Sequence, residues 1–388
     1  MTDASVIVCR YSSGMAERGM ISLVAAAAGA AAGTGAAQLG LGYGLGVVVW
    51  PVLPAADSGV WIGSLCWATW IAAGATVAGA VTAARLGHRR RPQGPWRLAL
   101  VAASAIGALT TVALIALPAR GAVRVDTYSP VTLAAGYAIV GILLGMAVAY
   151  GAVVSRPVAA NLLATAVWVW ALPAAAVVAG LISGHASPLY LTSWQFLVPG
   201  GSAWYGTFAW PDSALTLLIT LLAGGLAAWP AVRGGRLGLG TAVSGAAGPL
   251  LLAAVFLVQA PQLGGAPGPI GSAYLTAPYA VLTGLAGSAL AVEIGRRAFD
   301  RRARRVAGVP AAATARVAAR RQARDVPTAV AQESALVPVF VSRDSPADPA
   351  PPSAAGDIGT DPSPPVRRRS TVARPPMVPP VAKINPPR

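Results

Sequence analysis

The chain has 388 residues, of which 55% are hydrophobic and only 11% are charged, and its net charge is +16. No residue between Arg156 and Asp212, or between Arg236 and Glu293, carries a formal charge. Water-soluble domains need charged residues on their exposed faces, so this composition excludes a soluble globular protein. Apolar runs of about 20 residues span a bilayer core as helices. We therefore expect an all-α, polytopic integral membrane helix bundle.

The choice of basic residues indicates a bacterial source. Lys383 is the only lysine among the 29 basic residues, and the chain is rich in Ala, Gly, Pro and Val. This bias is typical of high-GC bacterial coding, so the expected location is a bacterial plasma membrane. Cys9 and Cys66 are expected at different depths of the bilayer, which argues against a disulfide. No cluster of Cys and His has metal-ligand spacing.

In chain order, a cytoplasmic segment (1–19) is expected to precede eight transmembrane helices. Residues 19–56 contain no charge, which is too long for one span at about 1.5 Å per residue, so the alternate glycines from Gly40 to Gly46 are expected to end the first helix. The stretch after Arg18 also resembles a cleavable signal peptide, and that alternative stays open. Within 20–293, the expected spans are 20–44, 60–84, 98–118, 131–154, 159–183, 213–232, 240–260 and 274–293.

The basic residues of the short loops predict the orientation of these spans. The loops near 85–97, 155–158 and 233–239 together hold eight basic residues, whereas the alternate loops hold two. Because positively charged loops stay in the cytoplasm, the first set is expected inside. Eight spans then place both the N- and C-termini in the cytoplasm.

Small and neutral polar residues inside the spans are expected to serve helix packing. The pairs Gly29–Gly33 and Gly141–Gly145 bring small residues onto one helix face, where they allow packing within the bundle or a seam between copies. No sequence repeat relates the first four spans to the last four. The polar residues expected to bond between helices rather than bind a substrate are Gln38, Thr110, Thr111 and Asn161.

The loop 184–212 is the most distinctive segment, because it is long, carries one formal charge at Asp212 and is rich in aromatic residues. Two interpretations stay open. In the first, the loop is an interfacial belt in which Tyr190–Val198 lies flat as a short amphipathic helix. In the second, it forms an outer aromatic cleft that stacks on sugars, lipids or cationic headgroups. The candidate cleft residues are Tyr190, Trp194, Trp204, Tyr205 and Trp210.

No residue pattern indicates catalysis, a metal site or a cofactor site. Ion-coupled transporters bury an ionisable group near the middle of the membrane, and none of the expected spans has one at its centre. Glu293 lies at the end of the last span and is expected to pair with Arg296 and Arg297. Three outer carboxylates stand in separate loops, a poor arrangement for a metal-dependent lipid-linked transferase; they are Asp57, Asp126 and Asp212.

The composition changes abruptly after the last span. Residues 296–388 hold 17 basic and 7 acidic residues and so carry +10 of the net charge. Two short basic helices, separated at Pro310, are expected in 294–326, and the Pro-rich tail 327–388 is expected to be disordered. Each basic side chain near an anionic leaflet contributes about 1 kcal/mol. The residues expected to contact anionic headgroups are Arg89, Arg90, Arg91, Arg296, Arg297, Arg301, Arg302, Arg304 and Arg305.

These features favour a non-enzymatic scaffold or anchor of the bacterial envelope. Its expected partners are membrane lipids and, through the tail, a cytoplasmic protein; nucleic acid is the less favoured partner, because the membrane surface already accounts for the basic charge. The alternative is a permease or channel-like subunit for a neutral or lipid-like solute. The sequence does not predict the oligomeric state.

Overall fold

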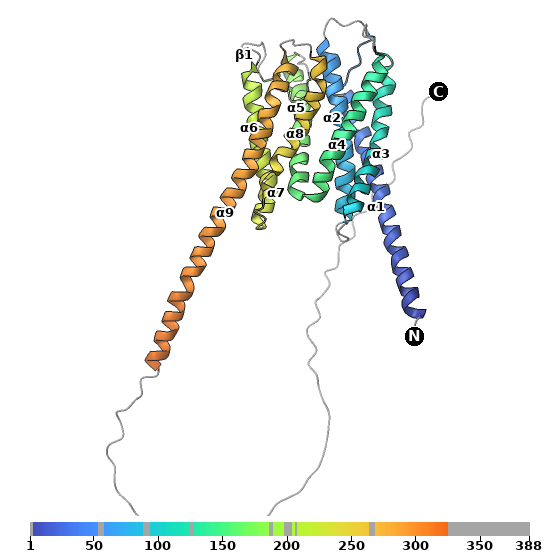
Figure 1. Cartoon of the computed structure of the whole chain (residues 1–388). Coiled ribbons are helices and arrows are strands. Elements are labelled where there is room, and N and C mark those ends of the chain that lie inside the picture. Colours follow the sequence, from blue (N-terminus) through green and yellow to red (C-terminus); the bar gives the residue numbers. More distant parts are fainter. Residues whose placement is uncertain are drawn as a thin grey trace, which may run out of the picture. The chain divides into compact units, whose positions relative to one another are not determined.

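The computed structural model describes residues 3–52, 58–87, 94–123, 128–185, 189–197, 204–205, 208–263 and 268–324. These residues are almost entirely helical (Figure 1). Within these ranges, the strands are β1 (Trp204–Tyr205) and β2 (Phe208–Ala209), which pair antiparallel. The helices are α1 (Asp3–Gly44), α2 (Ser58–Leu86), α3 (Gly94–Ala119), α4 (Pro130–Val154), α5 (Arg156–Ser183), α6 (Trp210–Arg233), α7 (Leu239–Ala242), the 3₁₀ helix η1 (Ser244–Ala246), α8 (Ala247–Gln259), the 3₁₀ helix η2 (Ala260–Gln262) and α9 (Pro269–Arg324).

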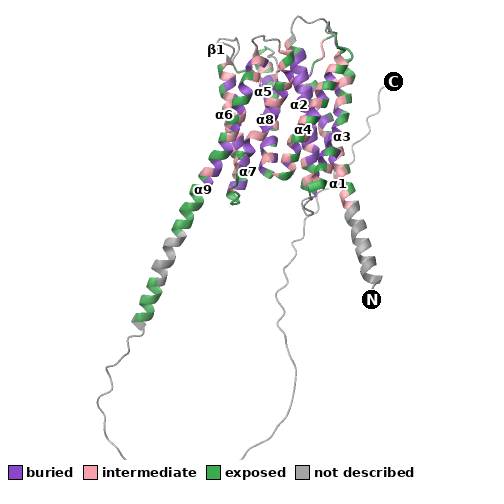
Figure 2. Ribbon diagram, viewed as in Figure 1, coloured by how far each residue is buried: buried purple, intermediate pink, exposed green. Residues whose placement is uncertain are grey.

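Eight stretches of the described chain are long and apolar enough to cross a membrane. Seven are single helices, and the eighth, Leu239–Gln262, runs from α7 through η2. Each of the eight expected segments falls inside one of these stretches. Buried residues line the inside of the bundle and exposed ones its outside (Figure 2). A surface of large exposed apolar side chains is typical of membrane helices, and examples on five helices are Ile106, Leu143, Val167, Leu226 and Leu282.

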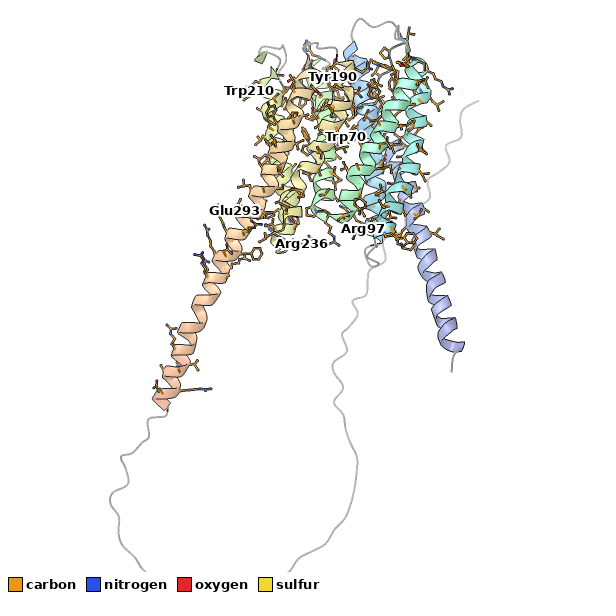
Figure 3. The ribbon with its side chains drawn as sticks, viewed as in Figure 1. Trp70, Arg97, Tyr190, Trp210, Arg236 and Glu293 are labelled. Atoms are coloured by element: carbon orange, nitrogen blue, oxygen red, sulfur yellow. The ribbon has the colours of Figure 1, made fainter. Side chains whose placement is uncertain are left out.

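The two ends of the bundle carry different residues. Figure 3 shows Tyr190 and Trp210 at one end, and Arg97, Arg236 and Glu293 at the other. We call these the aromatic end and the basic end. The helices α2, α4 and α6 therefore run from the aromatic end to the basic end, and the spans between them run the opposite way (Figure 1).

The first four spans and the last four pack in the same pattern. In the first half, α2 and α3 contact each other, α1 contacts both, and α4 contacts both. In the second half, α6 and the α7–α8 span contact each other, α5 contacts both, and α9 bonds to both. Spans two apart in the chain thus pack as parallel pairs in both halves. This repeat was not expected, because it lies in the pairing of helices and not in the residues.

Glycines allow the parallel pairs to approach at the level of the backbone. A Cβ atom on Gly141 would lie 2.3 Å from the carbonyl oxygen of Thr69, and one on Gly145 would lie 2.7 Å from that of Ala73. The Gly141–Gly145 pair therefore packs α4 against α2 within the chain and is not available as a seam between copies. In contrast, no described atom of a neighbouring helix lies within 4 Å of a Cβ built on either residue of the Gly29–Gly33 pair.

The first and last helices of the bundle both extend beyond the expected spans. The first helix ends at Gly44, as the glycine run predicted, and Gly46 adopts a left-handed conformation with φ of 72°. However, α1 already begins at Asp3, so residues 3–18 continue the helix. Likewise α9 runs without a break through Pro310 to Arg324, where two separate helices were expected. The tail 327–388 lies outside the described residues.

Candidate functional site

Of the five predicted cleft residues, the structure describes the side chains of Tyr190, Trp194 and Trp210, and these three lie against different parts of the bundle. The ring of Tyr190 lies against Gly63 of α2, where a Cβ would approach it to 2.9 Å. Trp194 covers the end of α6 instead, because its indole N–H donates to Thr216 Oγ1 at 3.1 Å. Trp210 opens α6 with 65% of its surface exposed. Trp204 and Tyr205 form β1, and their side chains lie outside the described residues.

The loop that carries Tyr190 and Trp194 is held by the helices beneath it. The indole N–H of Trp67, on α2, donates to the carbonyl oxygen of Leu189 at 3.0 Å. The described residues 190–197 hold two short turns and no helix, where an amphipathic helix over Tyr190–Val198 was expected; Val198 lies outside the described residues. The described part of the loop therefore bridges α2 of the first half and α6 of the second half at the aromatic end.

Beneath this loop lies a cavity between α5, α6, α8 and α9 that sequence reasoning missed. The cavity and its open mouth enclose about 460 Å³ of empty space. The interior has room for little more than one or two water-sized groups. One wall is polar and comes from α6 and α9: Asp212, Ser213, Thr216, Thr220, Ser272 and Thr276. The opposite wall is apolar and comes from α5 and α8: Trp168, Pro249, Leu252 and Phe256.

The polar wall is built by the parallel register of α6 and α9. The hydroxyls of Ser213 and Thr276 pair at 2.8 Å, and those of Thr220 and Thr283, one heptad further along each helix, also pair at 2.8 Å. Side chains seven apart return to the same helix face, so one register satisfies both pairs. Thr276 donates to the backbone oxygen of Ser272 at 2.8 Å, which leaves Ser213 to donate to Thr276.

Three hydrogen-bond donors of residues that line the cavity have no acceptor among the described residues. The hydroxyl of Thr216 accepts from Trp194, and that of Ser272 accepts from the backbone N–H of Ala209 at 3.0 Å, but neither donates to another described residue. The indole Nε1 of Trp168, a residue only 8% exposed, has no partner among the described residues. Buried polar groups normally find a partner, but unpaired ones also occur away from this cavity among the described residues, for example Trp70 Nε1 and Thr111 Oγ1.

Asp212 is the one charged residue of the cavity lining. It lies in the first turn of α6, half-buried, and its Oδ2 accepts from the backbone N–H of Trp194 at a long 3.4 Å. A carboxylate in the first turn of a helix is favoured by the helix dipole. The other expected outer carboxylates, Asp57 and Asp126, lie outside the described residues. Within the described ranges, no three His, Cys, Asp or Glu side chains gather as a metal site.

The span Leu239–Gln262, which borders the cavity, is irregular near its start, about one turn from the basic end. Between α7 and α8 the helix passes through η1, and side chains from two neighbours bond the freed backbone groups. Ser288 of α9 accepts from the N–H of Gly245 at 3.1 Å and donates to the oxygen of Ala242. Asn161 of α5 accepts from the N–H of Gly248 at 2.7 Å. Irregular backbone at membrane depth is tolerated where such partners bury it.

Of the four polar residues expected to bond between helices, two do so and two do not among the described residues. Asn161 does so through Gly248, and Gln38 of α1 accepts from the indole N–H of Trp170 of α5 at 3.2 Å. Thr110 instead donates to Gly107 of its own helix. The buried hydroxyl of Thr111 has no partner among the described residues.

At the basic end, α9 leaves the bundle as an exposed helix. Glu293 pairs with Arg297 at 2.9 Å, as expected, whereas Arg296 donates to the carbonyl oxygen of Leu237 at 3.1 Å. The side chains of residues 296–305 and 315–322 are exposed. Of the residues expected to contact anionic headgroups, Arg89, Arg90 and Arg91 lie outside the described residues. The other six lie on α9.

Comparisons with known proteins add no relative to this picture. No protein-family model, no curated protein and no solved structure matches the chain.

Proposed function

We propose that the chain is a multi-pass protein of a bacterial plasma membrane, with its basic end and both termini in the cytoplasm. The eight apolar stretches and their exposed apolar surface support insertion. The gathering of Arg97 and Arg236 at one end, opposite the aromatic residues, supports the orientation (Figure 3). Arg120 follows α3 at the aromatic end and is the described exception.

Within this setting, the proposed role is that of a non-enzymatic scaffold or anchor. The observation that carries the proposal is the continuity of α9, whose helix passes from the bundle into exposed basic turns without interruption. The 56-residue helix thus joins the last apolar stretch to the basic turns that precede the tail in the sequence. The bundle then serves to fix the protein in the bilayer, and the tail serves to bind a cytoplasmic partner.

A permease or channel-like subunit for a neutral solute is the second candidate, and the polar cavity favours it. The broken span beside the cavity adds to this, since discontinuous helices often border the substrate sites of transporters. No charged residue other than Asp212 lines the cavity, which fits an uncharged solute better than an ion.

Removal of residues 327–388 separates the two candidates. For a scaffold, the truncated chain should insert normally but lose its cellular position and its cellular role, as measured by fluorescence microscopy and growth. The matched control replaces the same residues with a Gly/Ser linker of equal length, and it should fail in the same way. If the truncated chain supports the full cellular role, the scaffold proposal is wrong and the permease candidate takes its place.

A further inference from the structure

We infer that the turn between α6 and α7, together with the facing turn of α9, binds the headgroup of one anionic phospholipid. The residues that carry the inference are Arg233, Arg236 and Arg296, at the basic end, where Arg236 is labelled in Figure 3. Neither Arg233 nor Arg236 was among the residues expected to contact headgroups. The inference rests on the proposed placement of the chain in a membrane, and it adds a defined site to the general attraction of basic side chains for an anionic leaflet.

The backbone of this turn has a fixed conformation. Gly235 follows the end of α6 with φ of 75°, and its N–H donates to the oxygen of Val232 at 2.9 Å. The N–H of Arg236 donates to the oxygen of Ala231 at 3.0 Å. These two bonds form the Schellman motif that closes the C-terminus of a helix. Arg236 therefore leaves the end of α6 at a defined place, with its side chain exposed.

Helix α9 packs closely against the turn and adds the third arginine. A Cβ on Gly295 would overlap the side chain of Val232 and would lie 3.1 Å from Cδ2 of Leu237. The guanidinium of Arg296 donates to the oxygen of Leu237, the residue after Arg236, at 3.1 Å. This bond uses one of the five N–H donors of the guanidinium, so the group is held at the turn with donors left for a ligand.

The charge of the turn favours an anion that offers several acceptor oxygens. Guanidinium groups bind phosphate through paired N–H donors. The acidic residues in 230–305 are Glu293 and Asp300. Glu293 pairs with Arg297 at 2.9 Å, which leaves Asp300 to oppose the three arginines of the turn. The turn therefore keeps a positive charge, which fits the phosphate of an anionic headgroup.

The exposed face of α6 favours a lipid over a soluble phosphate. One face of this helix carries four side chains spaced four, three and four residues apart, namely Leu222, Leu226, Trp229 and Arg233. Leu222 and Leu226 are 49% and 70% exposed. The guanidinium carbon of Arg233 lies 5.3 Å from the centre of the Trp229 ring, and tryptophan favours the level of the headgroups. An acyl chain along this face would therefore place its phosphate at the arginines.

Native mass spectrometry of the purified full chain in detergent tests the inference. Dioleoyl phosphatidylglycerol should bind about tenfold more tightly than dioleoyl phosphatidylcholine, which has the same acyl chains and no net charge. Inorganic phosphate at equal concentration should not displace the bound lipid. Equal binding of the two lipids, or displacement by phosphate, overturns the inference. The measurement does not depend on which end faces the cytoplasm, so such a failure would leave the proposed topology standing, and cysteine labelling tests that topology separately.

Variants separate a defined site from diffuse attraction between charges. Arg236→Gln should weaken the binding of phosphatidylglycerol about fivefold, and it should fold normally because the bonds of the turn come from the main chain. Arg304→Gln is the matched control, since it removes the same charge from α9 about two and a half turns after Gly295, on the opposite face of the helix. It should change the binding by less than about twofold. Equal losses in the two variants would indicate diffuse attraction and would overturn the site.

Discussion

At the scale of single residues, glycine and serine decide how closely the helices of this protein pack. A glycine removes the side chain where two backbones meet, and a serine supplies hydrogen bonds where a backbone is irregular. Identity alone does not tell which glycines matter, because Gly29 and Gly145 have the same small-residue pattern in the sequence. Of these two glycines, only Gly145 lies against the backbone of another helix among the described residues.

Substitution of Gly145 by alanine should therefore destabilise the bundle. The new Cβ would lie 2.7 Å from the oxygen of Ala73, so α2 and α4 must separate. Overpacking of this kind costs about 1–3 kcal/mol, which unfolding in a mixed-micelle titration would measure. Gly29→Ala is the matched control, and it should be within about 0.5 kcal/mol of the unmodified chain. Equal stability of the two variants would contradict the close packing of α4 on α2.

At the scale of elements, the broken span between Leu239 and Gln262 depends on side chains from its neighbours. Ser288 bonds both sides of the break, and Asn161 bonds the first turn of α8. Without such partners, backbone groups at membrane depth would be unsatisfied. The break therefore couples α5, the α7–α8 span and α9 into one unit.

Replacement of Ser288 by alanine should loosen this unit. It removes the acceptor of the Gly245 N–H and the donor to Ala242, and the expected loss of stability is about 1–2 kcal/mol. Amide hydrogen exchange near Gly245 should accelerate in the variant. Thr110→Ala removes a hydroxyl that bonds only its own helix and should leave that region unchanged. Normal protection at Gly245 in Ser288→Ala would show that the serine does not support the break.

Hydropathy and glycine positions predicted much at this scale. They placed all eight apolar stretches and the end of α1 at Gly44, because span length and backbone freedom are local properties. They did not predict that α9 continues through Pro310. A proline inside a helix usually kinks or ends it, and here the helix continues on both sides of it. They also missed the polar wall, because Ser213 and Thr276 meet only through the register of two helices.

At the scale of the whole molecule, two halves with the same helix pairing carry different interiors. In the first half, α2 is packed on nearly all sides, and its largest buried side chains are Trp61, Trp67 and Trp70. In the second half, the hydroxyls of α6 and α9 leave a small polar cavity. The same arrangement of four helices thus encloses a tightly packed core in one half and a small polar cavity in the other.

The proposed function depends on the placement of both halves in a membrane with the basic end inward, and cysteine accessibility tests this placement most directly. In a background of Cys9→Ser and Cys66→Ser, single cysteines replace Tyr128 at the aromatic end and Leu239 at the basic end, both well exposed. An impermeant maleimide applied to intact cells should label Tyr128→Cys alone, and Leu239→Cys should react only after the membrane is opened. Labelling of both positions in intact cells, or of Leu239→Cys alone, would contradict the proposed topology.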